Sequence, residues 1–160
     1  MRSLRAELSA LGLALVVVAC EAPATSRDAS PIDAAQPSAF AVALGTGSAM
    51  FEPLDAEGTL VLERGPQGLQ HVYVSVRAPV EEGLHEVDVI IERDARVLSA
   101  PTRLRVPFLR ETGREAEATG LLVVVPDPSG FTEGESARLR VRVEAAGAWG
   151  ASERDVRLRW

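Results

Sequence analysis

Polar and apolar residues alternate with a period of two through most of the chain after residue 40. The alternation is plainest near the C-terminus, where arginines separate Leu139, Val141 and Val143. Further runs of this kind occupy residues 40–44, 59–63, 71–77, 86–92, 103–108 and 156–160. A period of two places the apolar residues on one face of a β-strand, and no stretch repeats with the helical period of about 3.6 residues. The chain is therefore predicted to be built from strands.

Seven to nine short strands are expected, because glycine, proline and aspartate separate the runs. One separator, Gly65-Pro66-Gln67-Gly68, is typical of a tight turn. The apolar run at residues 121–125 predicts a central strand that is buried on both faces. The spacing favours one all-β domain, a single antiparallel β-sandwich of immunoglobulin-like architecture, and a small closed barrel is the alternative.

The first twenty residues have the organisation of a secretory leader. Arg2 and Arg5 make its N-terminus positive, and an apolar run follows from Leu8 to Val18. This run is shorter than the ~20 residues of a membrane-spanning helix and fits a signal peptide. Its end, Val17-Val18-Ala19-Cys20, resembles the lipobox of bacterial lipoproteins. The resemblance implies cleavage before Cys20 and attachment of acyl chains such as palmitate to it. A plain secretory signal with a chance cysteine is the alternative.

These features divide the chain into three parts. Residues 1–19 are the predicted signal peptide, and residues 20–39 are the acylated cysteine with a disordered tether rich in Ala, Pro and Ser. Residues 40–160 are the predicted β-sandwich domain. We expect a monomer anchored in the cell envelope by its lipid. Glu21 follows the cysteine, where an aspartate retains enteric lipoproteins in the inner membrane, so the outer membrane is favoured, at either its periplasmic or its surface face.

Charge and cysteine content exclude several classes of protein. Without residues 1–19, which hold two arginines and one glutamate, the chain has 15 arginines, 22 acidic residues and a net charge of −7. Nucleic-acid binding, which depends on a basic surface, is therefore not expected. Cys20 is the single cysteine, so the domain has no internal disulfide and no zinc site built from cysteines.

Arginines recur at alternate positions of the last two predicted strands, as Arg138, Arg140, Arg142, Arg157 and Arg159. Sequential strands are neighbours in roughly two-thirds of cases, and these side chains would then share one face. Guanidinium groups bind phosphates and carboxylates through paired hydrogen bonds, so this face is a candidate site for lipid phosphates, acidic glycans or acidic proteins. The alternative that we favour is a solvated face whose arginines pair with acids on adjacent strands.

Catalytic and metal-ligating residues are scarce. His71 and His85 are the only histidines, and Met50 is the only methionine after the leader. A zinc or copper site needs three or four ligands, so no metal or other cofactor is predicted. The loop Gly45-Thr46-Gly47-Ser48 lacks the Gly-Lys-Ser/Thr of a phosphate-binding loop, and no serine has a nucleophile-elbow context. The chain is predicted not to be an enzyme. The alternative is a metal-binding or hydrolytic envelope enzyme that uses His71, His85 and nearby acids.

One further stretch resembles known sequences. Phe51-Glu52-Pro53-Leu54 is followed by Gly65-Pro66-Gln67-Gly68-Leu69-Gln70-His71-Val72. Over residues 45–77, and together with the lipobox, the chain resembles uncharacterised predicted lipoproteins of GC-rich deltaproteobacteria of the myxobacterial type. The resemblance implies no particular activity. If the turn has a role, its candidate binding residues are Phe51, Gln67, Gln70 and His71; otherwise the glycines only shape a hairpin.

Together these observations predict a lipid-anchored envelope protein without enzymatic activity, whose β-sandwich contacts other molecules. Its expected partners are the membrane, through the lipid, and either an envelope protein or an acidic glycan. An accessory subunit of a larger envelope complex is a further alternative. The residues do not identify the ligand.

Overall fold

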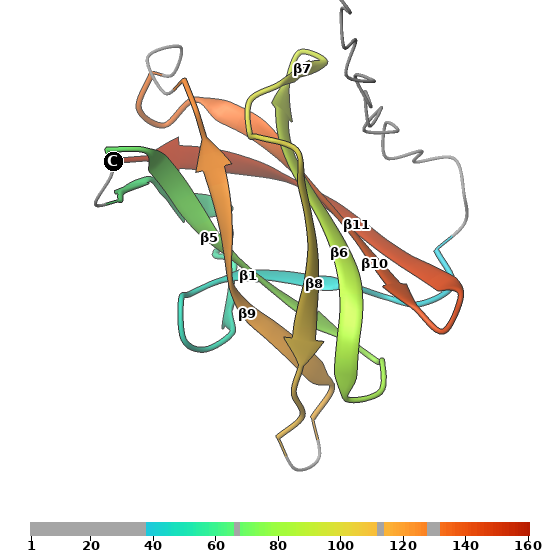
Figure 1. Ribbon diagram of the computed structural model, residues 1–160. Coiled ribbons are helices and arrows are strands. Elements are labelled where there is room, and N and C mark those ends of the chain that lie inside the picture. The colour runs from blue at the N-terminus through green and yellow to red at the C-terminus, as the bar shows by residue number, and fades with distance from the viewer. Residues whose placement is uncertain (1–37, 66–67, 112–113, 128–131) are drawn as a thin grey trace, which may run out of the picture.

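The computed structural model describes residues 38–65, 68–111, 114–127 and 132–160, which form eleven strands in two sheets (Figure 1). Sheet A contains β3 (Thr59–Val61), β6 (Gly83–Arg93), β7 (Arg96–Val97), β8 (Thr102–Phe108), β10 (Ser136–Ala145) and β11 (Ala148–Arg159). Sheet B contains β1 (Ala43–Thr46), β2 (Glu52–Pro53), β4 (Glu63–Arg64), β5 (Gln70–Ala78) and β9 (Ala116–Val125). None of these described residues is helical.

The predicted all-β sandwich, immunoglobulin-like in its two-layer architecture, is confirmed. Eight strands have three or more residues, which agrees with the seven to nine expected, and β2, β4 and β7 have two residues each. The strands form two separate hydrogen-bonded sheets, so the alternative of one closed barrel does not describe the fold.

Strand order shows where the pairing departs from a purely antiparallel scheme. Sheet A has the order β3-β11-β10-β6, and both β7 and β8 pair with the far side of β6. In sheet B, β5 is central, with β9 on one side and β1 and β4 on the other. The exception is β3, which runs parallel to β11. It arises because the chain passes β11 at Phe40, which forms a parallel bridge with Gly150, crosses to sheet B as β1, and later returns as β3.

The core lies between the sheets and is built from the apolar half of each alternating run. Its fully buried members include valines of β5 and β6 and leucines of β3, β10 and β11, and Phe108 is the largest of them. Burying a Val, Leu or Ile side chain contributes about 1.5–3 kcal/mol. The period-two pattern therefore predicted which side chains face inward.

The prediction for residues 121–125 is wrong. They belong to β9, which pairs with the single strand β5 and has only a bridge to Leu109 and a bond from the Ala100 amide on its other edge in the described residues, so the strand is not central. Its side chains alternate between the core and the outside, so that Val123 is fully buried while Leu122 is 44% exposed. An apolar run looks the same in sequence whether another layer covers its second face or not.

A loop covers part of the outer face of sheet B. The pairing of β5 and β9 contains a bulge between Val74 and Val76, and Gly120 lies on its β9 side with a φ of +68°. A Cβ at Gly120 would lie 2.5 Å from the carbonyl oxygen of Ser48, so the loop after β1 rests directly on this glycine. The Ser75 hydroxyl donates a hydrogen bond of 2.9 Å to the Gly47 carbonyl and is fully buried although it faces outward.

Candidate functional site: the two outer faces of the sandwich

Charged residues of opposite sign alternate across the outer face of sheet A. On β6 and β8, Asp88 lies opposite Arg103, which donates two hydrogen bonds of 2.6 and 2.9 Å to its carboxylate. These bonds and the charge of Asp88 raise the pKa of the Arg103 guanidinium. Asp88 also lies opposite Arg142 of β10. Cross-strand pairs of this kind stabilise neighbouring strands and leave little unbalanced charge.

The five arginines of the predicted basic face do lie on this surface, because β10 and β11 pair along their whole length. Arg140 contacts Glu92 at 3.4 Å and Glu153 at 3.9 Å. Arg138 contacts Glu153 and Asp155, and Arg159 contacts Glu57. The Arg142 guanidinium lies over the Trp149 ring, 3.1 Å from its centroid. For Arg157, the described part of the chain places no carboxylate within 4 Å.

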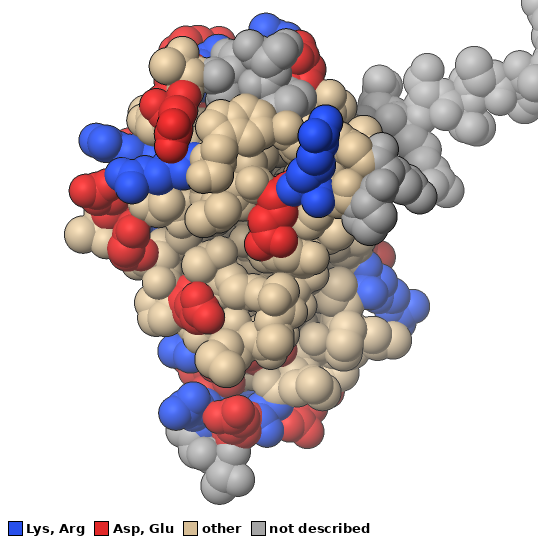
Figure 2. Space-filling model, turned by 90° about the vertical axis from the view of Figure 1, so that its left-hand side faces the viewer, with Lys and Arg blue, Asp and Glu red and all other residues tan. Residues whose placement is uncertain are grey.

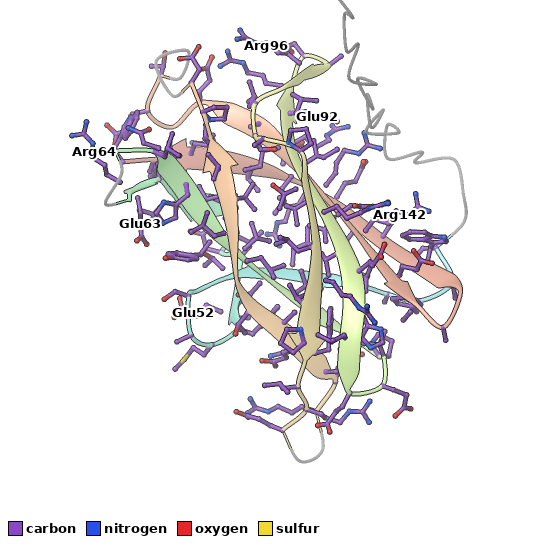
Figure 3. All side chains as sticks on the ribbon, in the orientation of Figure 1. Glu52, Glu63, Arg64, Glu92, Arg96 and Arg142 are labelled. Atoms are coloured by element: carbon purple, nitrogen blue, oxygen red, sulfur yellow. The ribbon has the colours of Figure 1, made fainter. Side chains whose placement is uncertain are left out.

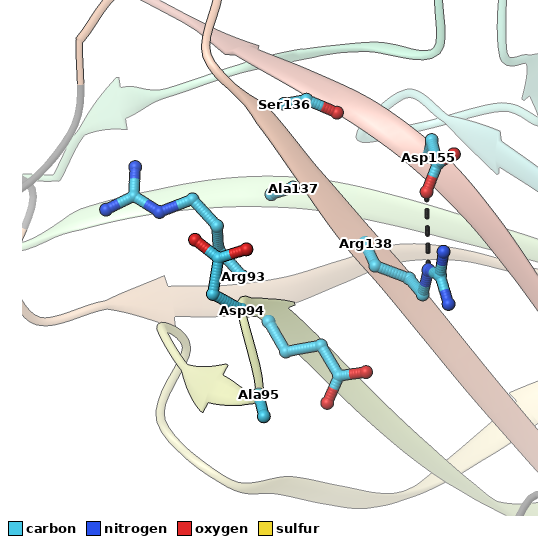
Figure 4. A pocket seen from close by; sticks show the side chains of 8 residues that line it. Arg93, Asp94, Ala95, Ser136, Ala137, Arg138 and Asp155 are labelled. Carbon is cyan, nitrogen blue, oxygen red and sulfur yellow. Dashed lines mark hydrogen bonds and ion pairs between the residues drawn. The ribbon is translucent and has the colours of Figure 1, made fainter.

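A hollow of about 380 Å³ lies at one end of this face, beside the hairpin of β6 and β7 (Figure 4). Arg93, Asp94, Arg138 and Asp155 are among its lining residues, and a dashed line in Figure 4 marks the contact between Arg138 and Asp155. Arg93 forms an ion pair with Glu135. Both arginines thus already have carboxylate partners, and the hollow is not a ready-made site for a further anion.

The two histidines do not converge. His71 lies at the start of β5 in sheet B, 8% exposed, with its ring edge-on to Tyr73. His85 lies near the start of β6 in sheet A, edge-on to Phe108, and its Nε2 is 2.8 Å from the Glu81 carbonyl oxygen. Over the described ranges, no group of three His, Cys, Asp or Glu residues is placed to hold a metal ion.

The four residues predicted around the tight turn do not form one site either. The turn exists, because the Gly68 amide donates to the Gly65 carbonyl at 2.9 Å, but Gln67 lies outside the described residues. Gln70 lies at the inner side of β5, and the neighbouring His71 faces outward. Phe51 packs instead beneath Arg77, whose guanidinium is 4.1 Å from the ring centroid. Residues 71 and 77 are six positions apart, or about 20 Å along a strand.

The outer face of sheet B lacks the charge pattern of sheet A. At its centre, Tyr73 lies opposite Leu122, and His71 lies opposite Val124. Leu122 and Met50, from the covering loop, are 44% and 65% exposed. Figure 2 looks at this side of the molecule and shows a broad uncharged area below its centre, with one red and one blue group above that area and most other charged groups toward the margins. Labelled charged residues on this side, Glu52, Glu63 and Arg64, come from the short strands β2 and β4 (Figure 3).

Sequence reasoning did not single out this uncharged face, which we define by Met50, Tyr73, Leu122 and Val124. The residue types in the sequence nevertheless indicate this face. The outward positions in the middle of β5 and β9 hold no Arg, Asp or Glu, whereas those of β10 are mostly arginine. Exposed apolar surface that is contiguous and rimmed by polar residues is typical of interaction sites.

Comparisons with other proteins add little. No protein-family model matches the sequence, and no curated protein matches it. Among solved structures, the CooA pilin subunit from enterotoxigenic Escherichia coli aligns with 72% of this chain and 95% of its own, at 10% identity and a TM-score of 0.39. No helix in the described residues has the length and hydrophobicity needed to cross a membrane.

Proposed function

We propose that the chain is a lipid-anchored, non-enzymatic protein of the cell envelope whose β-sandwich binds another protein through the uncharged face. The observation that carries this proposal is the contrast between the outer faces. Sheet A pairs its charges internally, while sheet B exposes Leu122, which lies opposite Tyr73, and the loop that covers sheet B exposes Met50. Aromatic and methionine side chains are enriched at protein interfaces, where charged residues are depleted.

The anchor in this proposal rests on the lipobox-like residues that end at Cys20, which lie outside the described residues. The first described residues lie beside β11, since the Ala39 amide donates to the Trp149 carbonyl at 2.7 Å. In Figure 1 the first described residues lie at the right of the molecule, and β1 runs from there toward β5 and β9, whose labels lie to the left. A chain attached to a bilayer before residue 38 would thus leave the uncharged face accessible to a partner. Location at the outer membrane belongs to the same proposal.

The interface is tested by placing a charge on each of two exposed aliphatic side chains. Leu122 of β9 is 44% exposed and Val61 of β3 is 52% exposed, so the two sites accept a carboxylate at similar cost. A photoreactive residue at Tyr73 should crosslink one defined envelope protein. Leu122→Glu should lower the yield of that crosslink at least about tenfold, the effect of losing roughly 1.4 kcal/mol of binding, whereas Val61→Glu should leave it unchanged. Equal crosslink yields from the protein without a further substitution, from Leu122→Glu and from Val61→Glu would refute an interface at this face.

The anchor is tested separately. Cys20→Ser should abolish incorporation of labelled palmitate and release the protein from the membrane fraction, because one residue carries all the acyl chains. Labelling that persists in Cys20→Ser would exclude the lipoprotein proposal and leave the interface proposal standing.

A further inference from the structure

The edge of β11 that faces away from β10 is covered at its two ends and open between them. At one end the Ala39 amide donates to the Trp149 carbonyl, and at the other the Arg157 amide donates to the Gly58 carbonyl at 3.0 Å. The Ala151 amide donates to the Ser38 hydroxyl at 3.1 Å. Strand residues direct their backbone groups alternately to the two sides, so the amide and carbonyl of Glu153 also point to this edge. No described residue pairs with them.

Beside this open edge lies a hollow of about 460 Å³ that is lined by residues of β11 in sheet A and of β1 and β2 in sheet B. Its walls include the apolar side chains of Val42, Leu44, Phe51 and Leu54. Val42, Leu44 and Leu54 are 6–8% exposed, so the floor of the hollow is the rim of the core.

The residues that β11 contributes here break its own pattern. Val156 and Leu158 face the core, and Ser152 and Arg154 occupy the same inward phase, opposite the core residues Val141 and Leu139 of β10. A polar and a charged residue thus stand where an apolar pair would close the sandwich. Departures of this kind from a regular pattern mark functional or strained positions.

Arg154 gives the hollow its charge. Its guanidinium donates to the backbone carbonyl of Asp55 at 2.7 Å, and no described carboxylate lies within 4 Å of it. Arg77, the other arginine of the lining, is paired with Glu117. Glu153 directs its carboxylate to the outer face, where Arg140 and Arg138 contact it. One cation without a described carboxylate partner therefore lies beside a strand edge that no described residue pairs and a hollow whose walls include apolar side chains.

We infer that this hollow is an acceptor site for a short extended segment of a partner protein that carries an aliphatic residue and, two positions away, an acidic one. The segment adds to the edge of β11 through the amide and carbonyl of Glu153, as in other β-strand additions. Residues two positions apart on a strand point to the same side, about 6.6 Å from each other. The aliphatic side chain then contacts Leu44 and Leu54, and the carboxylate binds Arg154. This site is distinct from the uncharged face of the proposed function.

The test uses the mature chain, residues 20–160 with Cys20→Ser, and an acetylated, amidated pentapeptide of sequence Thr-Val-Thr-Asp-Thr as the probe. Titration followed by amide NMR should shift the resonances of Glu153 and Asp155. Arg154→Met should weaken binding at least about tenfold, the value of a charge-assisted hydrogen bond. The matched control Arg157→Met, which removes an exposed arginine from the outer face of the same strand, should leave binding unchanged.

Two altered probes test the mode of binding in the unaltered protein, so the result does not depend on how well a variant folds. A probe with lysine in place of aspartate should bind at least about tenfold more weakly, because it places like charge beside Arg154. A probe N-methylated at the residue that pairs with Glu153 should not bind. Three results would each overturn the inference: shifts confined to β8 or β9, equal binding of the lysine probe, or no shift at Glu153. The last result is also the one expected if residues 20–37 of the chain occupied the hollow in place of a partner. Leu122→Glu should not affect the pentapeptide, so either proposal can fail alone.

Discussion

The two sheets of the sandwich bury similar valines and leucines on their inner faces and differ almost entirely on their outer faces. Sheet A carries rows of arginine, aspartate and glutamate that neutralise one another between strands, as at Arg103 and Asp88. Sheet B exposes Leu122 beside Tyr73 and covers Ser75 with a loop. Charged side chains that are already paired within a sheet contribute little to the free energy of binding a partner, whereas burying exposed apolar surface contributes favourably to it. This contrast is the reason for proposing that sheet B provides an interface for another protein.

The loop that covers sheet B makes the stability of the protein sensitive to substitution of Gly120, on which the loop rests. Gly120→Ala should lower the free energy of unfolding by about 2–4 kcal/mol, because the new Cβ meets the Ser48 carbonyl and the backbone is left-handed there. Gly147→Ala, in the hairpin of sheet A, has the same backbone strain but open space around it, and should cost only about 1–2 kcal/mol. Urea denaturation measures both. Equal losses would show that the loop does not press on the bulge.

The charge pairs on the outer face of sheet A should make its stability depend on salt. Arg140→Met removes the contacts with Glu92 and Glu153 and should cost about 1 kcal/mol at low ionic strength. The loss should shrink in 1 M salt, where the Debye length is about 3 Å. Arg138→Met, at a half-exposed position on the same strand, is the control and should cost about 0.5 kcal/mol or less. A loss for Arg140→Met that is unchanged by salt would mean that packing, and not charge, stabilises this face.

A substitution in the hairpin of β6 and β7 in sheet A should change the free energy of unfolding by a smaller amount and should raise it. Asp94 and Ala95 have φ values of 49° and 64°, as in a hairpin turn that favours glycine at its second position. Ala95→Gly should raise the free energy of unfolding by about 0.5 kcal/mol, since relief of the left-handed strain exceeds the added chain entropy. Ala148→Gly, at a strand position, should instead lower it. Loss of stability in both variants would contradict the strain at Ala95.

The smallest expected effect on stability concerns Asp55, which lies in the connection between β2 of sheet B and β3 of sheet A. The amide of Thr59 donates to the Asp55 carboxylate at 2.9 Å and, as the first of several hydrogen bonds, lowers the pKa of Asp55 below its ordinary value of 3.8. A carboxyl with a lower pKa in the folded state stabilises the fold at pH values above its unfolded pKa and loses that contribution as the pH falls through the folded value. Asp55→Asn should therefore flatten the stability profile below pH 4. An unchanged profile, measured by thermal unfolding against pH, would refute this coupling.

Individual residues show how far the sequence could predict the fold. Val72, Val74 and Val76 face the core as their period requires, because alternation acts within one strand. Leu122 was predicted to be buried and is not, since burial of its face depends on which strands lie beside and above β9.

The candidate sites were harder to predict. The arginine face was predicted on the condition that β10 and β11 are neighbours, and their short hairpin makes them so. The predicted grouping of Phe51 with His71 fails, because the two residues lie near opposite ends of β5. Arg154 was missed although Val156 and Leu158 already set the phase that turns it inward.

The sequence by itself determined that the chain forms strands, where most turns lie and which side chains enter the core. These properties depend on neighbours a few positions apart. The tertiary structure decided that β9 lies at an edge, that a loop covers Ser75, and that the edge of β11 is open at Glu153. Each of these depends on contacts between segments distant in sequence, which compete with other pairings of the same strands, so local alternation carries no record of them.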